Sequence, residues 1–248
     1  MAISKYIPNA LTLLNLTCGL LALIQIFNGY YDFAFYFVCL GIFFDFWDGF
    51  AARKLGVSSE LGVQLDSLAD MVTSGVVPGL MMFKLFEQIQ ENIPQFKVTE
   101  DTFYMGIVPY LGFLITLASC YRLAKFNIDE RQTENFIGLP TPANTLLIMS
   151  IPMIQYADEY QWLTDVLDNP YVLLAITLLS AYLLNAEIKL FSLKLKDFSW
   201  ANNKVRFSFV VYALILLLFL NVLAIPVIIL SYILVSMVVN TTAKNGNN

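Results

Sequence analysis

Long apolar stretches follow one another along almost the whole chain, and they constrain its fold more than any other feature. A helix that crosses the hydrocarbon core of a bilayer needs about 20 mostly apolar residues. Reading the sequence at that length predicts eight membrane-spanning helices, the last two forming an antiparallel hairpin. They are expected at residues 10–27, 33–50, 64–86, 106–125, 142–157, 171–190, 206–221 and 223–240. The fold class that follows is an all-α, polytopic membrane helix bundle.

Composition supports a membrane protein and argues against several other classes. Apolar residues make up 58% of the chain and charged residues 13%, whereas a soluble domain is about half apolar and about a quarter charged. The chain carries too little charge for a surface that faces water, which argues against disorder, nucleic-acid binding and an ordinary secreted domain. Histidine is absent, so a Ser-His-Asp triad and histidine-ligated metal sites are excluded.

Lysine and arginine concentrate on one side of the predicted bundle. Cytoplasmic loops of membrane proteins are enriched in these residues. With eight spans and a cytoplasmic N-terminus, only Lys84 and Lys97 fall on the far side. The other twelve of the 14 are Lys5, Arg53, Lys54, Arg122, Lys125, Arg131, Lys189, Lys194, Lys196, Lys204, Arg206 and Lys244. We therefore expect a protein of the cell membrane with both termini on the cytoplasmic side.

Four aspartates lie where the second and third spans meet at the predicted cytoplasmic face. Asp45 and Asp48 are three residues apart near the end of one span, and Asp66 and Asp70 are four apart near the start of the next. Both spacings place the pair on one face of a helix. Clustered carboxylate oxygens suit Mg²⁺, Mn²⁺ or Ca²⁺. Two such ions, about 3.5–4 Å apart, can clamp the attacking and leaving oxygens of a phosphoryl transfer.

Residues suited to binding phosphate surround the aspartates. A short turn that carries Gly56 and Gly62 is expected to bring the two helices antiparallel. Gly49 lets a ligand approach the backbone, Arg53 offers a planar fork for phosphate oxygens, and Ser59 can donate a hydroxyl hydrogen bond. These observations leave other interpretations open: solvated carboxylates at helix ends, a catalytically silent scaffold, or an ion transporter. A transporter would spread its acidic residues across the depth of several spans.

Residues 45–70 resemble the signature of the CDP-alcohol phosphotransferase family. The signature is D-x2-D-G-x2-A-R-x8-G-x3-D-x3-D, and the sequence keeps every spacing. The matching residues are Asp45, Asp48, Gly49, Ala52, Arg53, Gly62, Asp66 and Asp70. The resemblance implies a membrane enzyme with six core helices. Such an enzyme transfers a phosphatidyl or phosphoalcohol group from a CDP-alcohol to a hydroxyl, needs a divalent metal and releases CMP.

The resemblance also implies roles for individual residues. Mg²⁺ or Mn²⁺, as two ions, would be bound by Asp45, Asp48, Asp66 and Asp70. Asp70 would also take the proton from the acceptor hydroxyl. CDP-diacylglycerol would be contacted by Gly49, Arg53 and Ser59. Residues 7–12 are similar to the segment that lines the family's cytidine pocket, which adds Asn9 and Thr12 to the binding residues.

Two further segments resemble the members of this family that form phosphatidylserine. Residues 7–22 are similar to their beginning, and Asn15 stands where relatives that act on glycerol phosphate often carry an arginine. Residues 121–145 resemble the same subgroup and join the fourth and fifth spans on the side of the aspartates. Arg122 is expected to hold a serine carboxylate, and Asn127 its amine or carboxylate, although Arg122 also fits a positive-inside charge. The expected acceptor is L-serine, with glycerol 3-phosphate or an inositol phosphate as alternatives.

The resemblance covers about the first 190 residues. The expected organisation is a six-helix catalytic core over residues 1–190, two additional transmembrane helices over 191–240, and a polar tail over 241–248. The expected partners are CDP-diacylglycerol, L-serine and the lipid bilayer, with no nucleic acid. The family resemblance further implies a homodimer.

Overall fold

The computed structural model describes residues 6–92, 106–129, 136–190 and 200–245. Within these ranges every predicted span coincides with a helical segment, which confirms the all-α fold. The principal helices are α1 (Ile7–Phe27), α2 (Tyr31–Leu55), α3 (Glu60–Asp70), α4 (Val77–Asn92), α5 (Leu114–Ile128), α6 (Thr141–Gln155), α8 (Pro170–Asn185), α9 (Trp200–Leu220) and α10 (Ala224–Asn245). A short α7 (Gln161–Leu167) precedes α8. A π-helical segment (Met71–Val76) joins α3 to α4, so these two helices form the third predicted span.

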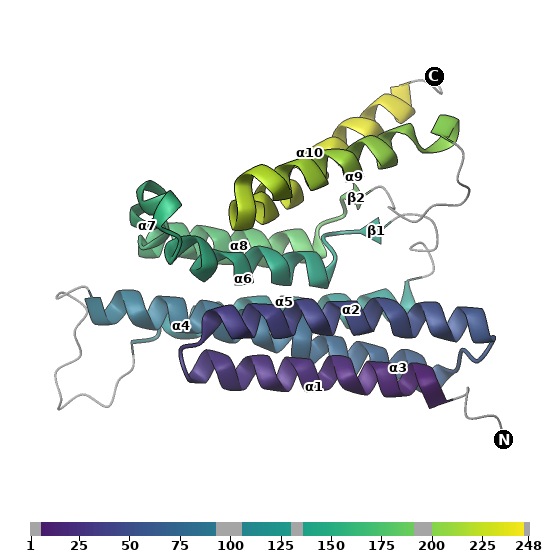
Figure 1. The fold of residues 1–248 in the computed structure, drawn as a ribbon, viewed down its shortest axis with the longest axis horizontal. Helices are drawn as coiled ribbons and strands as arrows, with labels where there is room; N and C mark the ends of the chain where they lie inside the picture. The colour runs from purple at the N-terminus through teal and green to yellow at the C-terminus, as the bar shows by residue number, and fades with distance from the viewer. Residues whose placement is uncertain (1–5, 93–105, 130–135, 191–199, 246–248) are drawn as a thin grey trace.

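The helices form layers whose long axes run along the bundle (Figure 1). Helices α1 to α5 lie together, α6 and α8 lie beside them, and the hairpin of α9 and α10 crosses α6 and α8 at an angle. One apolar core fills the space between α1, α2, α4, α6 and α8. A second, smaller core joins the hairpin to α6 and α8 through Leu183, Phe209, Ile229 and Ile233. The start of α1 and the end of α10 lie at the same end of the bundle (Figure 1).

Several helical stretches of the described chain are long and apolar enough to cross a membrane. They are Ile7–Phe27, Tyr31–Leu55, Glu60–Ile89 and Arg206–Val239. A fifth arises if Asp158–Leu167, which is α7 with the 3-10 turn before it, and Pro170–Asn185 (α8) are taken as one span that is bent by 84° at the break between them. Helices α5 and α6, with 15 residues each, are shorter than a typical crossing helix of about 20 residues. The chain is therefore an integral membrane protein in which shorter helices complete the bundle.

The structure corrects three boundaries that were expected from the sequence. The sixth predicted span ends at Asn185 instead of residue 190, because Lys189–Leu190 (β2) pairs antiparallel with Phe136–Ile137 (β1). Gly62 is not part of the turn between the second and third spans but lies inside α3. Helix α10 continues to Asn245, so most of the predicted polar tail is helical. Five cations of the predicted charge asymmetry lie outside the described residues: Lys5, Lys97, Arg131, Lys194 and Lys196.

Candidate active site

The turn between α2 and α3 places the aspartates, and its sequence explains its shape. Helix α2 ends at Gly56, which adopts the left-handed conformation (φ 65°) that favours glycine. The amide of Val57 then donates to the carbonyl of Ala52, closing the helix end. Ser59 caps α3, and its hydroxyl accepts a hydrogen bond of 3.1 Å from the amide of Gly62. The chain therefore reverses within four residues, and the two aspartate pairs face one another.

Three of the four aspartates form a compact oxygen cluster. One carboxylate oxygen from each of Asp45, Asp48 and Asp66 lies within 4.8 Å of the other two. Asp48 is buried, and Asp45 and Asp66 are half-buried. The Oδ1 atom of Asp66 is buried and has no hydrogen-bond partner among the described residues. A divalent cation with a preference for oxygen ligands fits this donor set, because it would both neutralise the carboxylates and satisfy that atom.

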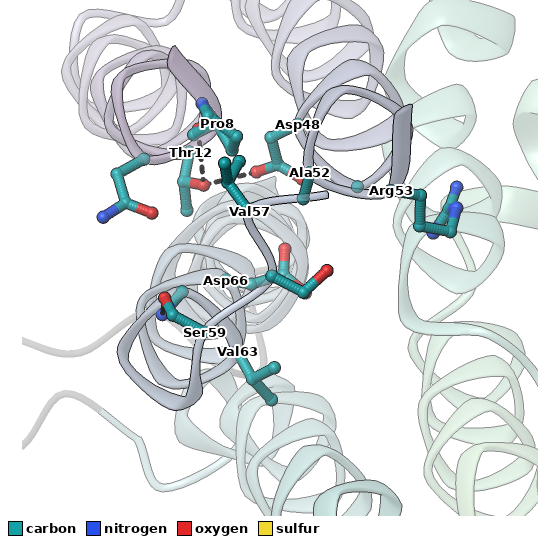
Figure 2. Close-up of a pocket in the computed structure, with 13 residues that line it drawn as sticks. Pro8, Thr12, Asp48, Ala52, Arg53, Val57, Ser59, Val63 and Asp66 are labelled. Carbon is teal, nitrogen blue, oxygen red and sulfur yellow. Dashed lines mark hydrogen bonds between the residues drawn. The ribbon is translucent and has the colours of Figure 1, made fainter. Parts of the chain in front are cut away.

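Helix α1 contributes a hydrogen bond to this cluster that the sequence did not reveal. The hydroxyl of Thr12 donates to Oδ2 of Asp48 at 2.5 Å, and both side chains are buried. Figure 2 shows this bond at the edge of the cleft, with Asp66 on the opposite wall. Thr12 was expected to contact the cytidine; in the structure its hydroxyl orients a carboxylate.

Asp70 lies one turn further along α3 and is not among the three oxygens of the compact cluster. Its Oδ1 accepts a hydrogen bond of 3.2 Å from Nδ2 of Asn15, and it interacts electrostatically with Arg122. Arg122 is only 7% exposed as a residue, and its buried Nε has no hydrogen-bond partner in the described structure. Asp70 thus interacts with aspartates of the oxygen cluster and with a buried cation whose Nε has no hydrogen-bond partner among the described residues.

An open cleft of about 200 Å³ adjoins the cluster. It is lined by Asp48 and Asp66 and by all five residues expected to contact CDP-diacylglycerol, which are Asn9, Thr12, Gly49, Arg53 and Ser59. At Gly49, an added Cβ would lie 3.3 Å from a guanidinium nitrogen of Arg53. The missing side chain of Gly49 therefore makes room for the arginine as well as for a ligand.

The residues expected to bind serine differ in their surroundings. Arg122 faces Asp70, whereas Asn127 is exposed and exchanges hydrogen bonds with Ser67, at 2.9 and 3.2 Å. Lys125 forms an ion pair of 2.8 Å with Glu187 beyond the end of α8. The structure therefore brings Arg122 near the aspartates, whereas Asn127 is exposed on α5 and bonded to Ser67 of α3.

Sequence reasoning used Asn15 only as a marker of the subgroup and did not predict its hydrogen bond to Asp70. A signal was present, because an asparagine in an apolar membrane span is costly unless it is hydrogen-bonded. Thr12 and Asn15 are three residues apart and so share one face of α1. Which aspartate each would meet depends on how α1 packs against α2 and α3, and that cannot be read from local spacing.

Comparison with known proteins identifies several relatives. The family model described as CDP-alcohol phosphatidyltransferase matches residues 5–184. The CDP-diacylglycerol–serine O-phosphatidyltransferase of Bacillus subtilis is 36% identical over 142 residues, which cover 56% of this chain and 70% of that protein. The enzyme of the same name from Methanocaldococcus jannaschii is 33% identical over 60% of this chain and 59% of its own length. The archaetidylserine synthase of Methanothermobacter thermautotrophicus is 27% identical, over 70% and 66% respectively.

Proposed function

Because the chain belongs to the CDP-alcohol phosphatidyltransferase family, we propose that it transfers a phosphatidyl group from CDP-diacylglycerol to the hydroxyl of L-serine. The products would be phosphatidylserine and CMP. The observation that carries the proposal is the convergence of Asp45, Asp48 and Asp66 beside the cleft, with Asp70 and Arg122 next to them. The names of the relatives support serine as the acceptor.

The donor would bind with its cytidine diphosphate in the cleft and its acyl chains along the apolar flank of the bundle. Arg53 would bind diphosphate oxygens, while Gly49 and Asn9 would line the nucleotide site. Ser59 already caps α3, so a contact with the donor would use its remaining hydrogen-bonding capacity. The acidic face of the cleft disfavours a diphosphate by itself, which is why a cation is needed there.

The family is generally dependent on a divalent metal, and the donor set fits one. We propose that Mg²⁺ or Mn²⁺, as two ions, is held by Asp45, Asp48, Asp66 and Asp70. When bound, the metal would neutralise the diphosphate and the charge that develops on the departing CMP. Thr12 would keep Asp48 in its binding orientation through the bond described above.

The transfer itself would be a displacement at the lipid-proximal phosphorus. Asp70 would accept the proton of the serine hydroxyl, and the serine oxygen would form a new bond to that phosphorus. The bond between this phosphorus and the bridging oxygen would break, and CMP would leave with the bonding electrons. Arg122 would bind the serine carboxylate and so aim the hydroxyl at Asp70. Asn127 would contact serine only after giving up its bonds to Ser67.

The location of the protein follows from the same features. We propose that the aspartates and both termini face the cytoplasm in the cell membrane, where serine is a soluble metabolite. Arg53 and Lys54 lie in the last turn of α2, and Arg122 and Lys125 lie in the last two turns of α5, which supports this orientation. We also propose a homodimer within the bilayer, with the six-helix core over residues 1–190 as the catalytic unit and α9–α10 as an addition.

A panel of acceptors tests the proposal. Purified protein in detergent receives CDP-diacylglycerol, Mn²⁺ and one acceptor at a time: L-serine, glycerol 3-phosphate or an inositol phosphate. We expect CMP release with serine alone. Release only with a phosphate-bearing acceptor would overturn the serine assignment while leaving the family chemistry intact. No release with any acceptor would favour transport or scaffold functions.

A further inference from the structure

The strongest unassigned feature of the molecule is the contact between α1 and Asp70. Asn15 is 1% exposed, and its Nδ2 donates to Oδ1 of Asp70. We propose that Asn15 is a positioning residue that fixes the orientation of Asp70, leaving the second carboxylate oxygen for the metal or the acceptor proton. This inference rests on the proposed function, because it assumes that Asp70 is a metal ligand and base.

A second hydrogen bond holds Asn15 itself in place. The hydroxyl of Thr73, also 1% exposed, donates to the backbone carbonyl of Asn15 at 3.1 Å. Thr73 lies in the π-helical segment that directly follows Asp70, and such segments are frequent at functional sites. The chain that carries Asp70 and the helix that carries Asn15 are therefore bonded at two points one turn apart.

Glycines allow this close approach on both sides. An added Cβ at Gly19 would overlap the hydroxyl of Thr73. An added Cβ at Gly41 of α2 would lie 2.9 Å from Cγ2 of Thr73 and 3.0 Å from Oδ1 of Asn15. Small residues of this kind let membrane helices pack closely. Here they enclose the pair of Asn15 and Thr73 and leave it little freedom to move.

Two further helices anchor the π-helical segment. Carbonyl groups in a π-helix are not all used by the regular helical ladder. The carbonyl of Ser74 accepts from the hydroxyl of Thr145 on α6 at 3.0 Å, and that of Gly75 accepts from Thr116 on α5 at 2.9 Å. The backbone after Asp70 is thus fixed from α1, α5 and α6 at once.

Packing alone does not explain an asparagine at this position. The Oδ1 atom of Asn15 is buried without a partner in the described structure, and an unsatisfied amide oxygen costs free energy. An apolar side chain of similar size would avoid that cost. The bond to Asp70 is what the amide provides, and groups that hydrogen-bond metal ligands typically change metal affinity by about 10- to 100-fold when they are removed.

Metal-dependent thermal unfolding tests the inference without relying on turnover. Purified wild type and Asn15→Ala are each unfolded over a range of Mn²⁺ concentrations, which gives the Mn²⁺ concentration for half-maximal stabilisation (the metal midpoint). The Mn²⁺ concentration for half-maximal CMP release is measured in parallel. In Asn15→Ala we expect both concentrations to rise about 10- to 100-fold over the wild type. In an Asp70→Asn background, Asn15→Ala should shift the midpoint no further.

Asn144→Ala is the matched control. Asn144 on α6 is equally buried and accepts a hydrogen bond from Ser180, but its own amide nitrogen donates to no carboxylate of the described structure. Its replacement should lower thermal stability and leave the metal midpoint unchanged. Should Asn15→Ala not fold, Thr73→Val carries the test, with Thr73→Ser restoring the wild-type midpoint.

The possible results separate the two hypotheses. If the wild type responds to Mn²⁺ and Asn15→Ala or Thr73→Val has the same midpoint, the positioning role is refuted and the proposed metal site stands. A shift of equal size in Asn144→Ala would also refute it, because the effect would then be general loss of stability. If the wild type shows no response to Mn²⁺ or Mg²⁺, the proposed metal site fails and the inference fails with it.

Discussion

Replacing Arg122 should weaken serine binding far more than donor binding. The residue is 7% exposed, and its buried Nε lacks a hydrogen-bond partner in the described structure, so water cannot readily take the place of a bound carboxylate. A hydrogen bond to a charged group is worth about 1.5–3 kcal/mol, and each 1.4 kcal/mol is about tenfold in affinity. We therefore expect Arg122→Lys, which loses the planar fork, to raise the KM for serine about 10- to 100-fold. Arg122→Met should raise it further.

Steady-state CMP release, with serine and CDP-diacylglycerol varied in turn, measures both KM values. Lys125→Met is the matched control from the same helix. Lys125 pairs with Glu187 at a partly exposed site, where such a pair contributes at most about 1 kcal/mol. The KM of Lys125→Met for serine should therefore stay near the wild-type value. A serine KM within about twofold of wild type in Arg122→Met would refute the assignment of this residue. Equal increases in both KM values would show a general distortion of the site instead.

Two further substitutions test the local geometry. Gly138→Ala should unfold at a lower temperature than Gly29→Ala in thermal scans. Both glycines have φ near 76°, where an L-residue costs about 1–2 kcal/mol. Only at Gly138 would the new Cβ also meet a backbone oxygen, that of Leu184, at 2.5 Å. Similar melting temperatures would contradict the packing of that turn. Thr12→Val should raise the Mn²⁺ concentration for half-maximal CMP release about tenfold, because it removes the bond to Asp48. Thr12→Ser should restore the wild-type concentration. An increase only in the KM for CDP-diacylglycerol would favour a cytidine contact instead.

Local patterns predicted the parts of the site that depend on one helix or one turn. The spacing of Asp45 and Asp48, and of Asp66 and Asp70, follows from helix periodicity, and the structure brings the first three together. The apolar stretches likewise predicted the helices, because bilayer thickness sets their length. Their ends were less well predicted, since caps such as Ser59 extend α3 by a turn beyond the apolar region.

Contacts between distant segments were the part that could not be predicted. The bonds of Thr12 to Asp48 and of Asn15 to Asp70 join residues 36 and 55 positions apart, and they depend on the packing of α1 in the bundle. The pairing of Asn127 with Ser67 has the same origin. Local sequence does not show which distant side chain a residue will contact. The roles of the individual site residues remain predictions.

Incorporation of radiolabelled L-serine into lipid tests the central claim most directly. Purified protein is incubated with labelled serine, CDP-diacylglycerol and Mn²⁺, and the lipid is extracted and separated. We predict a labelled phospholipid formed in equal amount to CMP, lost on chelation of the metal and lost in Asp70→Asn. Label that stays in the aqueous phase, while the same protein releases CMP with another alcohol, would contradict the proposed function.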